Sequence, residues 1–241
     1  MATMDSAGTG RLLLFGASGA IGGAVDRHYA EQGWQVVRIT RGTSHAPSGS
    51  FLAWNSLDDD LAGEAAVASM GPFDAVCWAQ GVNCNDNIFE FNASTHQSIY
   101  RANVLSILVS LNRLLIRDAL TKPSRLCVIS SIWQNQARQD KLSYCVSKAA
   151  VQGLILSLAN DLGRDGHLVN AVLPGVLETP MTRANLSENQ IRNVEASTRF
   201  GRLATLDDVA AAVYGLASFR NTGTTGQFLN VDLGYTHVRI I

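Results

Sequence analysis

The sequence predicts a single α/β domain in which a doubly wound, about seven-stranded parallel sheet is flanked by helices. Short apolar runs alternate with helix-like stretches along the chain, which is the pattern of strands joined by crossover helices. No repeat, low-complexity block or long linker interrupts the series, so one domain over residues 1–241 fits better than two. With 46% hydrophobic residues, a chain of this length can bury a large core without disulfides or a metal.

The first half of the chain carries four expected strands. The opening strand is the apolar run Leu12–Phe15, and a glycine-rich turn leads from it into a helix over about Ile21–Gln32. Gly33 follows this helix, where glycine can adopt the left-handed C-cap conformation. The segment Arg41–Ser50 is rich in Gly, Ser, Thr and Pro, which predicts a loop. The other strands are expected at Trp34–Thr40, Phe51–Trp54 and Phe73–Ala79.

The second half continues the alternation of helices and strands. A long amphipathic segment over about Ser94–Leu120 predicts a helix that packs on the core. A helix is also expected over Asp207–Ala217, because Thr205 provides a cap and acidic residues follow at its positive end. The remaining elements are a strand at Arg125–Ser130, a helix at Ser143–Leu162, and strands at Leu168–Leu173 and Phe228–Val231.

Charge and composition exclude several classes of partner. Nineteen Lys and Arg residues against twenty Asp and Glu give a formal net charge of −1, which leaves no basic surplus for nucleic acid or an anionic membrane. The uninterrupted apolar runs are far shorter than a bilayer span requires, and the N-terminal residues lack the features of a secretory signal. The four cysteines form no CxxC pair, so reduced thiols in the cytoplasm and no metal site are expected.

The turn after the first strand indicates a dinucleotide site. It reads Gly16-Ala17-Ser18-Gly19-Ala20-Ile21-Gly22, with the glycines three residues apart. Glycine permits a tight turn and lets the backbone approach a pyrophosphate, whose charge is met by free N–H groups and the helix dipole. The alternative is a glycine-rich turn that binds no ligand. In a doubly wound sheet the ligand should lie beyond the carboxyl ends of the strands.

The end of the second strand bears on which dinucleotide binds. A carboxylate at this place commonly binds the adenosine ribose and repels a 2′-phosphate. Here the strand ends in Thr40-Arg41, and a guanidinium can pair with phosphate in a bidentate fork. This favours NADP(H) over NAD(H), although Arg41 as an ordinary solvated loop residue is the alternative.

Ser131, Tyr144 and Lys148 form a spaced set. The interval of four places Tyr144 and Lys148 one helical turn apart on the same face. With three lysines and five tyrosines in 241 residues, chance gives this pair in about 6% of such chains, and a serine thirteen residues earlier lowers this to about half a per cent. A coincidence is therefore a poor explanation of the set.

With these residues, the chain resembles the short-chain dehydrogenase/reductase family, in its classical, 3-oxoacyl-carrier-protein-reductase-like branch. The resemblance covers nearly the whole chain and implies a Rossmann-type fold and an NAD(P)-dependent oxidoreductase. The segments that carry it are Gly16–Gly22, Ala102–Val104, Ile129–Ser131, Tyr144–Ala150, Val169–Gly175 with Thr179, and Thr225–Asp232. The chain departs from the family pattern at two places: Ala20 replaces the middle glycine of the turn, and Trp78-Ala79-Gln80-Gly81 retains only the last residue of Asn-Asn-Ala-Gly.

The resemblance implies a catalytic tetrad of Asn103, Ser131, Tyr144 and Lys148. A phenol near pKa 10 is a poor acid/base at neutral pH. A cation about 6 Å away at an effective dielectric near 20 favours the phenolate by roughly 2.8 kcal/mol, or about two pKa units before the cost of desolvation is subtracted. We therefore expect Lys148 to lower the pKa of Tyr144. Ser131 is expected to hydrogen-bond the substrate oxygen, where negative charge develops. The resemblance implies that Lys148 also holds the nicotinamide ribose, and that Asn103 connects Lys148 to solvent through a kinked helix and a water.

Further cofactor contacts are expected around these residues. Asn55 stands where the family has an adenine contact, and Thr179 with the backbone near Val176 is implied to touch the nicotinamide amide or the pyrophosphate. A polar, irregular segment over about residues 180–200 is expected to cover the substrate. The full set of expected cofactor-binding residues is Gly16, Ser18, Gly19, Ala20, Ile21, Gly22, Thr40, Arg41, Asn55, Ala79, Gly81, Tyr144, Lys148, Pro174, Gly175, Val176 and Thr179.

The function expected from this sequence is reduction of a ketone to a secondary alcohol with NADPH, on a 3-oxoacyl or similar small carbonyl substrate. One alternative keeps the fold without the chemistry, as a dinucleotide-binding sensor or scaffold, against which the intact Ser131-Tyr144-Lys148 set argues. Another is a methyltransferase with an adenosyl cofactor, which would need an acidic residue after the second strand and has no use for the Tyr-Lys pair. The resemblance also implies a homotetramer, or a homodimer, formed through the helices around residues 94–120 and 143–162 and the C-terminal strand.

Overall fold

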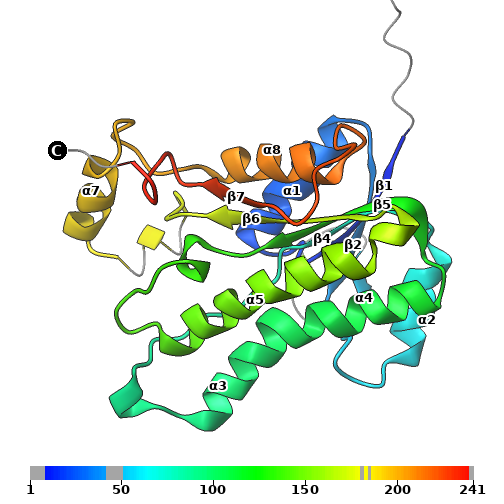
Figure 1. Ribbon diagram of the computed structural model, residues 1–241, viewed down its shortest axis with the longest axis horizontal. Coiled ribbons are helices and arrows are strands. Elements are labelled where there is room, and N and C mark those ends of the chain that lie inside the picture. The colour runs from blue at the N-terminus through cyan, green and yellow to red at the C-terminus, as the bar shows by residue number, and fades with distance from the viewer. Residues whose placement is uncertain (1–8, 42–50, 180–181, 184–185, 239–241) are drawn as a thin grey trace, which may run out of the picture.

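The computed structural model describes residues 9–41, 51–179, 182–183 and 186–238, and these form one α/β domain around a seven-stranded parallel sheet (Figure 1). The strand order is β3-β2-β1-β4-β5-β6-β7. The order therefore reverses between β1 and β4, and loops that follow these two strands diverge to opposite sides. Such a switch point is where doubly wound sheets bind their ligands.

The strands agree closely with the apolar runs of the sequence. Six of the seven begin and end within one residue of their expected bounds. The central strands β1, β4 and β6 are buried almost throughout, whereas β2, β3 and β7 include partly exposed residues. The strands are β1 (Arg11–Phe15), β2 (Gln35–Thr40), β3 (Phe51–Ala53), β4 (Phe73–Trp78), β5 (Leu120–Ile129), β6 (Leu168–Pro174) and β7 (Phe228–Val231).

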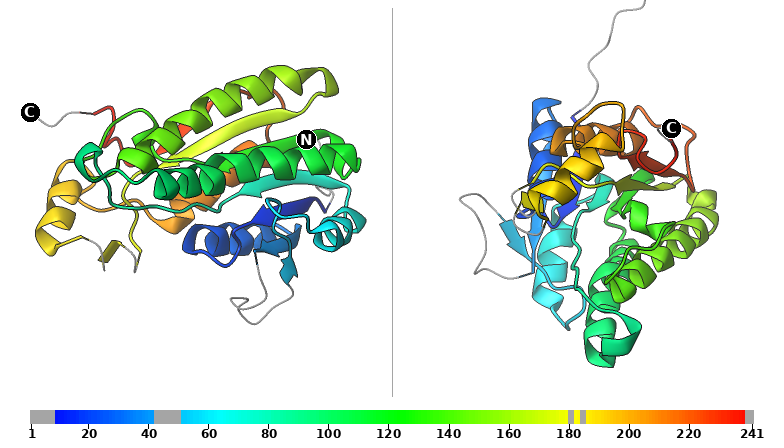
Figure 2. Two further views of the ribbon diagram at one scale, coloured as in Figure 1. Left: turned by 90° about the horizontal axis from the view of Figure 1, so that it is seen from below. Right: turned by 90° about the vertical axis from the view of Figure 1, so that its left-hand side faces the viewer.

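Helices cover both faces of the sheet (Figures 1 and 2). On one face, α1 (Ala20–Glu31) lies against α8 (Leu206–Ala217), and both pack on the central strands. On the other face lie α2 (Leu61–Ser69), α4 (Ser106–Ile116) and α5 (Leu142–Asp161), whose apolar side chains meet the sheet in a second core layer. The remaining helices of the described chain are α3 (Ala93–Tyr100), α7 (Glu188–Ala196), the π-helical segment η3 (Arg101–Leu105), and the short 3₁₀ segments η2 (Ile88–Glu90), η4 (Ile132–Gln134) and η5 (Gly163–Asp165).

Several expected boundaries were wrong. The long helix expected to reach Leu120 ends at Ile116, because Leu120 already pairs with Phe73 as the first residue of β5. The helix α2 was not expected, although Asp60 caps it by accepting a hydrogen bond from Gly63 N at 2.8 Å. The expected loop Arg41–Ser50 lies, apart from Arg41, outside the described residues.

The segment expected to be irregular over residues 180–200 contains a helix. In α7, Ser187 and Gln190 form a capping box, in which each side chain meets the backbone N–H of the other residue. Ile191 is buried and anchors the helix. Polar composition predicted an irregular segment here, but the two caps and one apolar anchor stabilise a short helix. Residues 180–181 and 184–185 of this segment lie outside the described residues.

Two helical stretches are long and apolar enough to span a bilayer by length and composition, namely Ala93–Ile116 and Leu142–Asp161. Both pack on the sheet in this structure. Ile107, Leu111 and Leu114 of the first, and Val151 and Ile155 of the second, belong to one core layer. Their apolar character is therefore accounted for in part by the core of an α/β domain.

Candidate active site

The turn from β1 into α1 leaves backbone N–H groups facing outward from a helix start. Gly16 has a φ of +73°, and a Cβ there would lie 2.6 Å from the backbone nitrogen of Gln80, so the position requires glycine. A Cβ on Gly22 would collide with the carbonyl oxygen of Gly16. Because glycine has no Cβ, α1 can begin close to the strand. The N-terminus of α1 has no side-chain cap and no acidic residue in its first turn. These features suit a bound anion.

A cavity of about 660 Å³ opens beside this turn at the carboxyl ends of β1, β2 and β4. Eight of the expected cofactor-binding residues line it: Gly16, Ser18, Gly19, Thr40, Arg41, Asn55, Ala79 and Gly81. Ala20, Ile21 and Gly22 are the first residues of α1 and lie behind the turn, outside the lining. The replacement of glycine by Ala20 leaves the turn intact, because Gly19 N donates to Gly16 O at 3.0 Å and Gly19 serves as N-cap.

Arg41 is the cation at the mouth of this cavity. Its side chain is exposed, and among the described residues no hydrogen bond or ion pair is found for it. Thr40, which precedes it, is buried at the end of β2. A free guanidinium at the end of the second strand is the arrangement that a 2′-phosphate would require.

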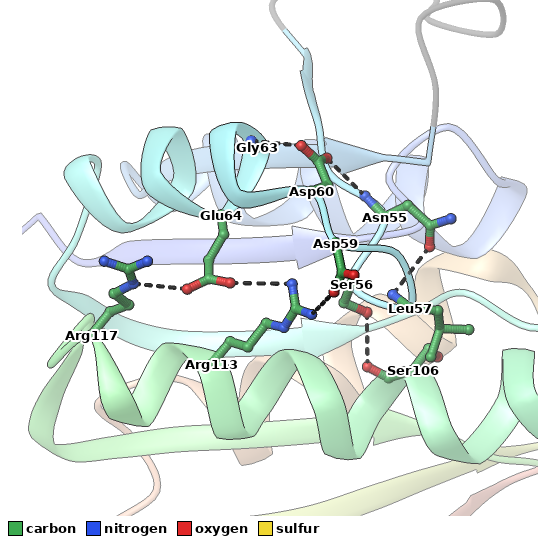
Figure 3. Close-up of polar contacts among 10 residues, drawn as sticks. All are labelled: Asn55, Ser56, Leu57, Asp59, Asp60, Gly63, Glu64, Ser106, Arg113 and Arg117. Carbon is green, nitrogen blue, oxygen red and sulfur yellow. Dashed lines mark hydrogen bonds and ion pairs between the residues drawn. The ribbon is translucent and has the colours of Figure 1, made fainter.

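Asn55 lies in a loop that is fixed to α4 (Figure 3). Its side-chain oxygen accepts from Leu57 N at 3.4 Å, and Ser56 Oγ donates to the carbonyl oxygen of Ser106 at 3.2 Å. Further along, Arg113 of α4 contacts Asp59 at 4.0 Å and Glu64 at 3.2 Å. This network holds the loop at the cavity wall.

Glu64 is the buried centre of that network. Arg117 Nε donates to one carboxylate oxygen at 2.7 Å and Arg113 Nη1 to the other at 3.2 Å, so both oxygens are paired (Figure 3). The Glu64 side chain is only 9% exposed. A buried carboxylate needs such partners. Here Glu64 belongs to α2, and its two arginine partners come from α4 and its C-cap, across the interface between the two helices.

Asn103 occupies the π-helical segment η3, where the wider helical turn forms the expected kink. Its Oδ1 accepts from Val82 N at 2.8 Å, and its Nδ2 donates to Val82 O at 3.0 Å and to Ser147 Oγ at 2.9 Å. The amide therefore joins the segment after β4 to the helix α5. A Cβ built on Gly81 would lie 3.5 Å from Asn103 Oδ1 and 3.6 Å from Lys148 Nζ, which places these two groups at one corner of the site.

Ser131, Tyr144 and Lys148 meet at the carboxyl end of β5. Lys148 is 4% exposed, and its Nζ donates to the carbonyl oxygen of Ile129 at 3.0 Å. The same Nζ lies 5.6 Å from the centroid of the Tyr144 ring. Ser131 is buried, and its hydroxyl lies close enough to Tyr144 to favour the phenolate. The set that spacing and resemblance predicted is thus assembled in space.

The electrostatics of this set differ from the expectation. Burial raises the pKa of Tyr144, and the nearby Ser131 hydroxyl offsets only part of that effect. The prediction that Lys148 lowers the pKa of Tyr144 below its ordinary value is wrong for this structure. Burial also lowers the pKa of Lys148, to about 8, since little solvent reaches the ammonium.

The residues after β6 lie at the same edge of the sheet. Pro174 is the last residue of β6, and Gly175 N donates to Val231 O at 3.0 Å. A Cβ on Gly175 would lie 2.7 Å from the Cβ of Asp232. Thr179 Oγ1 accepts from Thr182 N at 3.1 Å. Pro174, Gly175, Val176 and Thr179 lie outside the lining of the cavity.

Sequence reasoning missed some of the cavity wall. Trp54 and Gln80 line it, and the Trp54 indole N–H and the Gln80 side-chain oxygen are buried without a hydrogen-bond partner among the described residues. Unpaired buried donors and acceptors are costly, so a polar ligand here is chemically reasonable. A dinucleotide fits these features together. Gly16 and Gly22 leave no room for a side chain, and Arg41 has no partner among the described residues. Trp54 and Gln80 add an unpaired donor and an unpaired acceptor. Within the described residues, no group of three or more His, Cys, Asp or Glu could hold a metal ion.

Comparison with known proteins identifies relatives of this arrangement. Residues 59–236 match a protein-family model described as enoyl-(acyl carrier protein) reductase. The 3-oxoacyl-[acyl-carrier-protein] reductase of Vibrio cholerae is 28% identical over 238 residues, covering 92% of this chain and 95% of its own. The D-erythrulose reductase of Gallus gallus is 28% identical over 236 residues, covering 93% of this chain and 95% of its own.

A solved structure shares the fold. The gluconate 5-dehydrogenase of Burkholderia cenocepacia, in complex with NADP and tartrate, superposes with a TM-score of 0.83 at 23% identity. The match covers 96% of each chain. The family model, the named relatives and the shared fold lead to one conclusion: this chain belongs to the classical short-chain dehydrogenase/reductase family and is an oxidoreductase.

Proposed function

We propose that this protein reduces a ketone to a secondary alcohol with NADPH, and that Tyr144 is the acid/base of the reaction. The observation that carries the proposal is the set at the end of β5, where Ser131 and Lys148 are buried beside a half-buried Tyr144 and the Lys148 ammonium lies 5.6 Å from the centroid of the Tyr144 ring. Family membership removes the methyltransferase alternative.

The proton chemistry follows from the burial of these side chains. A tyrosine whose pKa is raised by burial holds its proton at neutral pH, so the proton needed by the ketone oxygen is present. Because the raised pKa also makes the phenol a weaker acid, transfer of that proton depends on Ser131 and Lys148. Ser131 donates a hydrogen bond to the same oxygen and stabilises the negative charge that develops there. Lys148, with a pKa of about 8, remains largely protonated at pH 7 and stabilises Tyr144 after the proton has left.

NADPH would supply the hydride. We assign the pyrophosphate to the turn Gly16–Gly22, the 2′-phosphate to Arg41 with Thr40, and the adenine to Asn55. Ala79 and Gly81 would contact the ribose side of the molecule, and Lys148 would hold the nicotinamide ribose hydroxyls. The nicotinamide end would lie against Pro174, Gly175, Val176 and Thr179. The free guanidinium of Arg41 and the NADP named for the Burkholderia cenocepacia structure support NADP(H) over NAD(H).

The substrate class is a small ketone, of the 3-oxoacyl or sugar-like kind. The relatives named above act, by their names, on a 3-oxoacyl group carried by a protein and on erythrulose, both of which contain a ketone. The segment over residues 180–200, with α7 in its middle, would cover the substrate. The four cysteines are free thiols, which is compatible with the cytoplasm.

We further propose that the chain assembles as a homotetramer. The outer faces of α4 and α5 expose large apolar side chains, including Leu108, Ile116, Val146 and Leu156. Large apolar side chains exposed on the surface favour association with another protein surface where they lie together.

The test is turnover by the wild type and by Tyr144→Phe. A panel of small carbonyl compounds, followed by NADPH absorbance, identifies a substrate for the wild type. Tyr144→Phe is expected to lose at least about a thousandfold in kcat, because the proton donor is gone, while its affinity for NADPH stays within a few-fold. Turnover by Tyr144→Phe at the wild-type rate would contradict the assignment. Binding of NADPH without turnover of any compound would favour an inert sensor or scaffold.

A further inference from the structure

A second set of contacts joins the segment after β4 to the start of α5. Asp86 lies beside residues 140–142: Asp86 N donates to Asp140 O at 3.2 Å, and Leu142 N donates to Asp86 O at 3.2 Å. These bonds form an isolated parallel bridge between Asp86 and Lys141. The segment after β4 is therefore tied to the residues immediately before the helix that carries Tyr144.

The Asp86 side chain reaches into the first turn of that helix. One carboxylate oxygen accepts from Ser143 N at 3.0 Å, and the other accepts from the Ser143 hydroxyl and from Ser143 N at 3.3 Å. Asp86 is 9% exposed and Ser143 is fully buried. The N-cap residue Lys141 makes no side-chain cap, so Asp86 provides the capping carboxylate from elsewhere in the chain. A carboxylate at this end of a helix is stabilised by the free N–H groups and the dipole.

Two neighbours hold the same junction. The Lys141 ammonium donates to Asn83 Oδ1 and to the Cys84 carbonyl oxygen, each at 3.1 Å, and also to Asn85 Oδ1. His96 Nδ1 lies 2.9 Å from Ser143 Oγ. Because the Ser143 hydroxyl donates to Asp86, its oxygen can accept the proton of His96. The junction between residues 83–86 and 140–143 is therefore extensively hydrogen-bonded.

The placement of this junction gives it a mechanistic role. Tyr144 follows Ser143 directly in α5, and four residues before Asp86 lies Val82, whose N–H and carbonyl are both bound by Asn103. Val82 and Gly81 line the cofactor cavity. The Asp86–Ser143 contact thus ties a segment that lines this cavity to the first turn of the helix that carries Tyr144.

We propose that Asp86 is a positioning residue: its carboxylate, bound to Ser143, fixes the first turn of α5 so that Tyr144 stays beside Ser131 and Lys148. This inference rests on the proposed function, because it takes Tyr144 to be the acid/base. Burial alone would raise the pKa of Asp86, but its hydrogen bonds with Ser143 hold that pKa below the ordinary value, so the carboxylate is charged at neutral pH.

The test compares three variants with the wild type on the carbonyl substrate that the panel identifies. Asp86→Ala removes the contact, and kcat is expected to fall about 10- to 100-fold, the scale of a small misplacement of a reacting group. The affinity for NADPH, measured by fluorescence titration, is expected to stay unchanged. Asp86→Asn keeps an oxygen that can accept from Ser143 N, so it is expected to restore kcat to within a few-fold of the wild type. Ser143→Ala removes only the hydroxyl contact and is expected to lower kcat by a smaller factor.

Asp208→Ala is the matched control. Asp208 accepts from Thr205 N at 2.9 Å in the first turn of α8, a helix that carries none of the proposed catalytic residues. The variant Asp208→Ala is expected to lower the midpoint of thermal unfolding about as much as Asp86→Ala does, while its kcat stays at the wild-type value. An equal loss of kcat in Asp208→Ala would overturn the proposal, because it would show a general effect of lost stability.

The outcomes separate this inference from the proposed function. Wild-type turnover by Tyr144→Phe would overturn the proposed function and this inference with it. An inactive Tyr144→Phe together with wild-type kcat in Asp86→Ala would overturn this inference alone. If Asp86→Ala does not fold, Ser143→Ala decides: a lowered kcat with unchanged NADPH affinity supports the proposal, and an unchanged kcat overturns it.

Discussion

At the scale of the residue, Lys148 shows how the proposed chemistry acts against stability. Its ammonium is buried beside Tyr144 and hydrogen-bonded to Ile129 O, and burial holds its pKa at about 8. In the unfolded chain the same group has a pKa near 10.4. At pH 7 both states hold the proton, so the folded state bears the full cost of the buried charge, on the order of 3 kcal/mol.

Lys148→Met is therefore expected to raise the free energy of unfolding while abolishing turnover. At pH 7 the gain should be about 1–3 kcal/mol, since the lost hydrogen bond to Ile129 O offsets part of the relief. As the pH rises from 8 toward 10.5, the wild-type lysine loses its proton in the folded state, so the gain should shrink to below about 1 kcal/mol at pH 10. Urea unfolding at the two pH values measures this. A variant less stable than the wild type at pH 7 would contradict it.

Arg41 gives a second prediction at this scale. Arg41→Ala is expected to raise KM for NADPH by about 10- to 100-fold and to change KM for NADH by less than about threefold, because only NADPH carries the 2′-phosphate. Steady-state kinetics with each cofactor measure both values. Arg38→Ala is a suitable control, because Arg38 is paired with Asp26 at 2.7 Å and lies outside the cavity lining. Equal effects of Arg41→Ala on both cofactors would remove the argument for NADP(H).

At the scale of the element, the contact between α2 and α4 supports the side of the cavity where we propose that the adenine binds. Arg113 is 21% exposed and bridges Asp59 and the buried Glu64, while the loop of Asn55 and Ser56 is bound to Ser106 of the same helix (Figure 3). The binding loop therefore depends on a helix interface rather than on its own contacts alone.

Arg113→Met is expected to destabilise the protein by about 1–2 kcal/mol, because Glu64 keeps Arg117 as a partner but loses one charged hydrogen bond. It should also raise KM for NADPH a few-fold, since the loop of Asn55 loses part of its support. Thermal unfolding and steady-state kinetics measure the two effects. Arg192→Met, which removes an exposed pair with Glu188 in α7, should leave stability nearly unchanged. Similar losses of stability in both variants would contradict the role of burial.

The elements also show where prediction from sequence succeeds. Apolar runs predicted β1, β2, β4 and β6 closely, since a strand buried on both faces admits few polar residues. The interruption of the long helix by η3 cannot be located by periodicity, because one widened turn changes the spacing only locally. The resemblance, not the pattern, predicted a kink at Asn103. The helix α7 was missed because it rests on a capping box and one buried isoleucine within a polar segment.

At the scale of the whole molecule, the site draws on residues distant in sequence. Spacing predicted Tyr144 and Lys148 because they share one helix, and the resemblance placed Ser131 and Asn103 beside them. Trp54, Gln80 and the contact of Asp86 with Ser143 were not predicted, since they depend on which loops meet across the strand order. The direction of the pKa shift of Tyr144 was predicted wrongly, because the cost of burying the phenolate cannot be read from the sequence and exceeds the interactions that favour its charge.

The proposed assembly is tested on the intact chain. Sedimentation at micromolar concentration is expected to give a mass near four times 25.8 kDa. Leu156→Lys places a charge on the outer face of α5, where the leucine is 51% exposed, and should shift the mass toward smaller species without loss of the fold. Leu61→Lys, at an exposed leucine of α2, is the control and should leave the mass unchanged. A wild-type monomer would contradict the tetramer.

The close approach of Gly16 to the backbone of Gln80 has a consequence for diversification of this enzyme. Two loops from different strands touch there without room for even a methyl group, so every other amino acid is excluded whatever the substrate is. The obstacle is backbone rather than a movable side chain, and a change in one loop therefore could not be rescued by a single exchange in the other. Changes in substrate specificity must therefore come from other residues around the entrance of the cavity, while the contact between Gly16 and Gln80 stays the same.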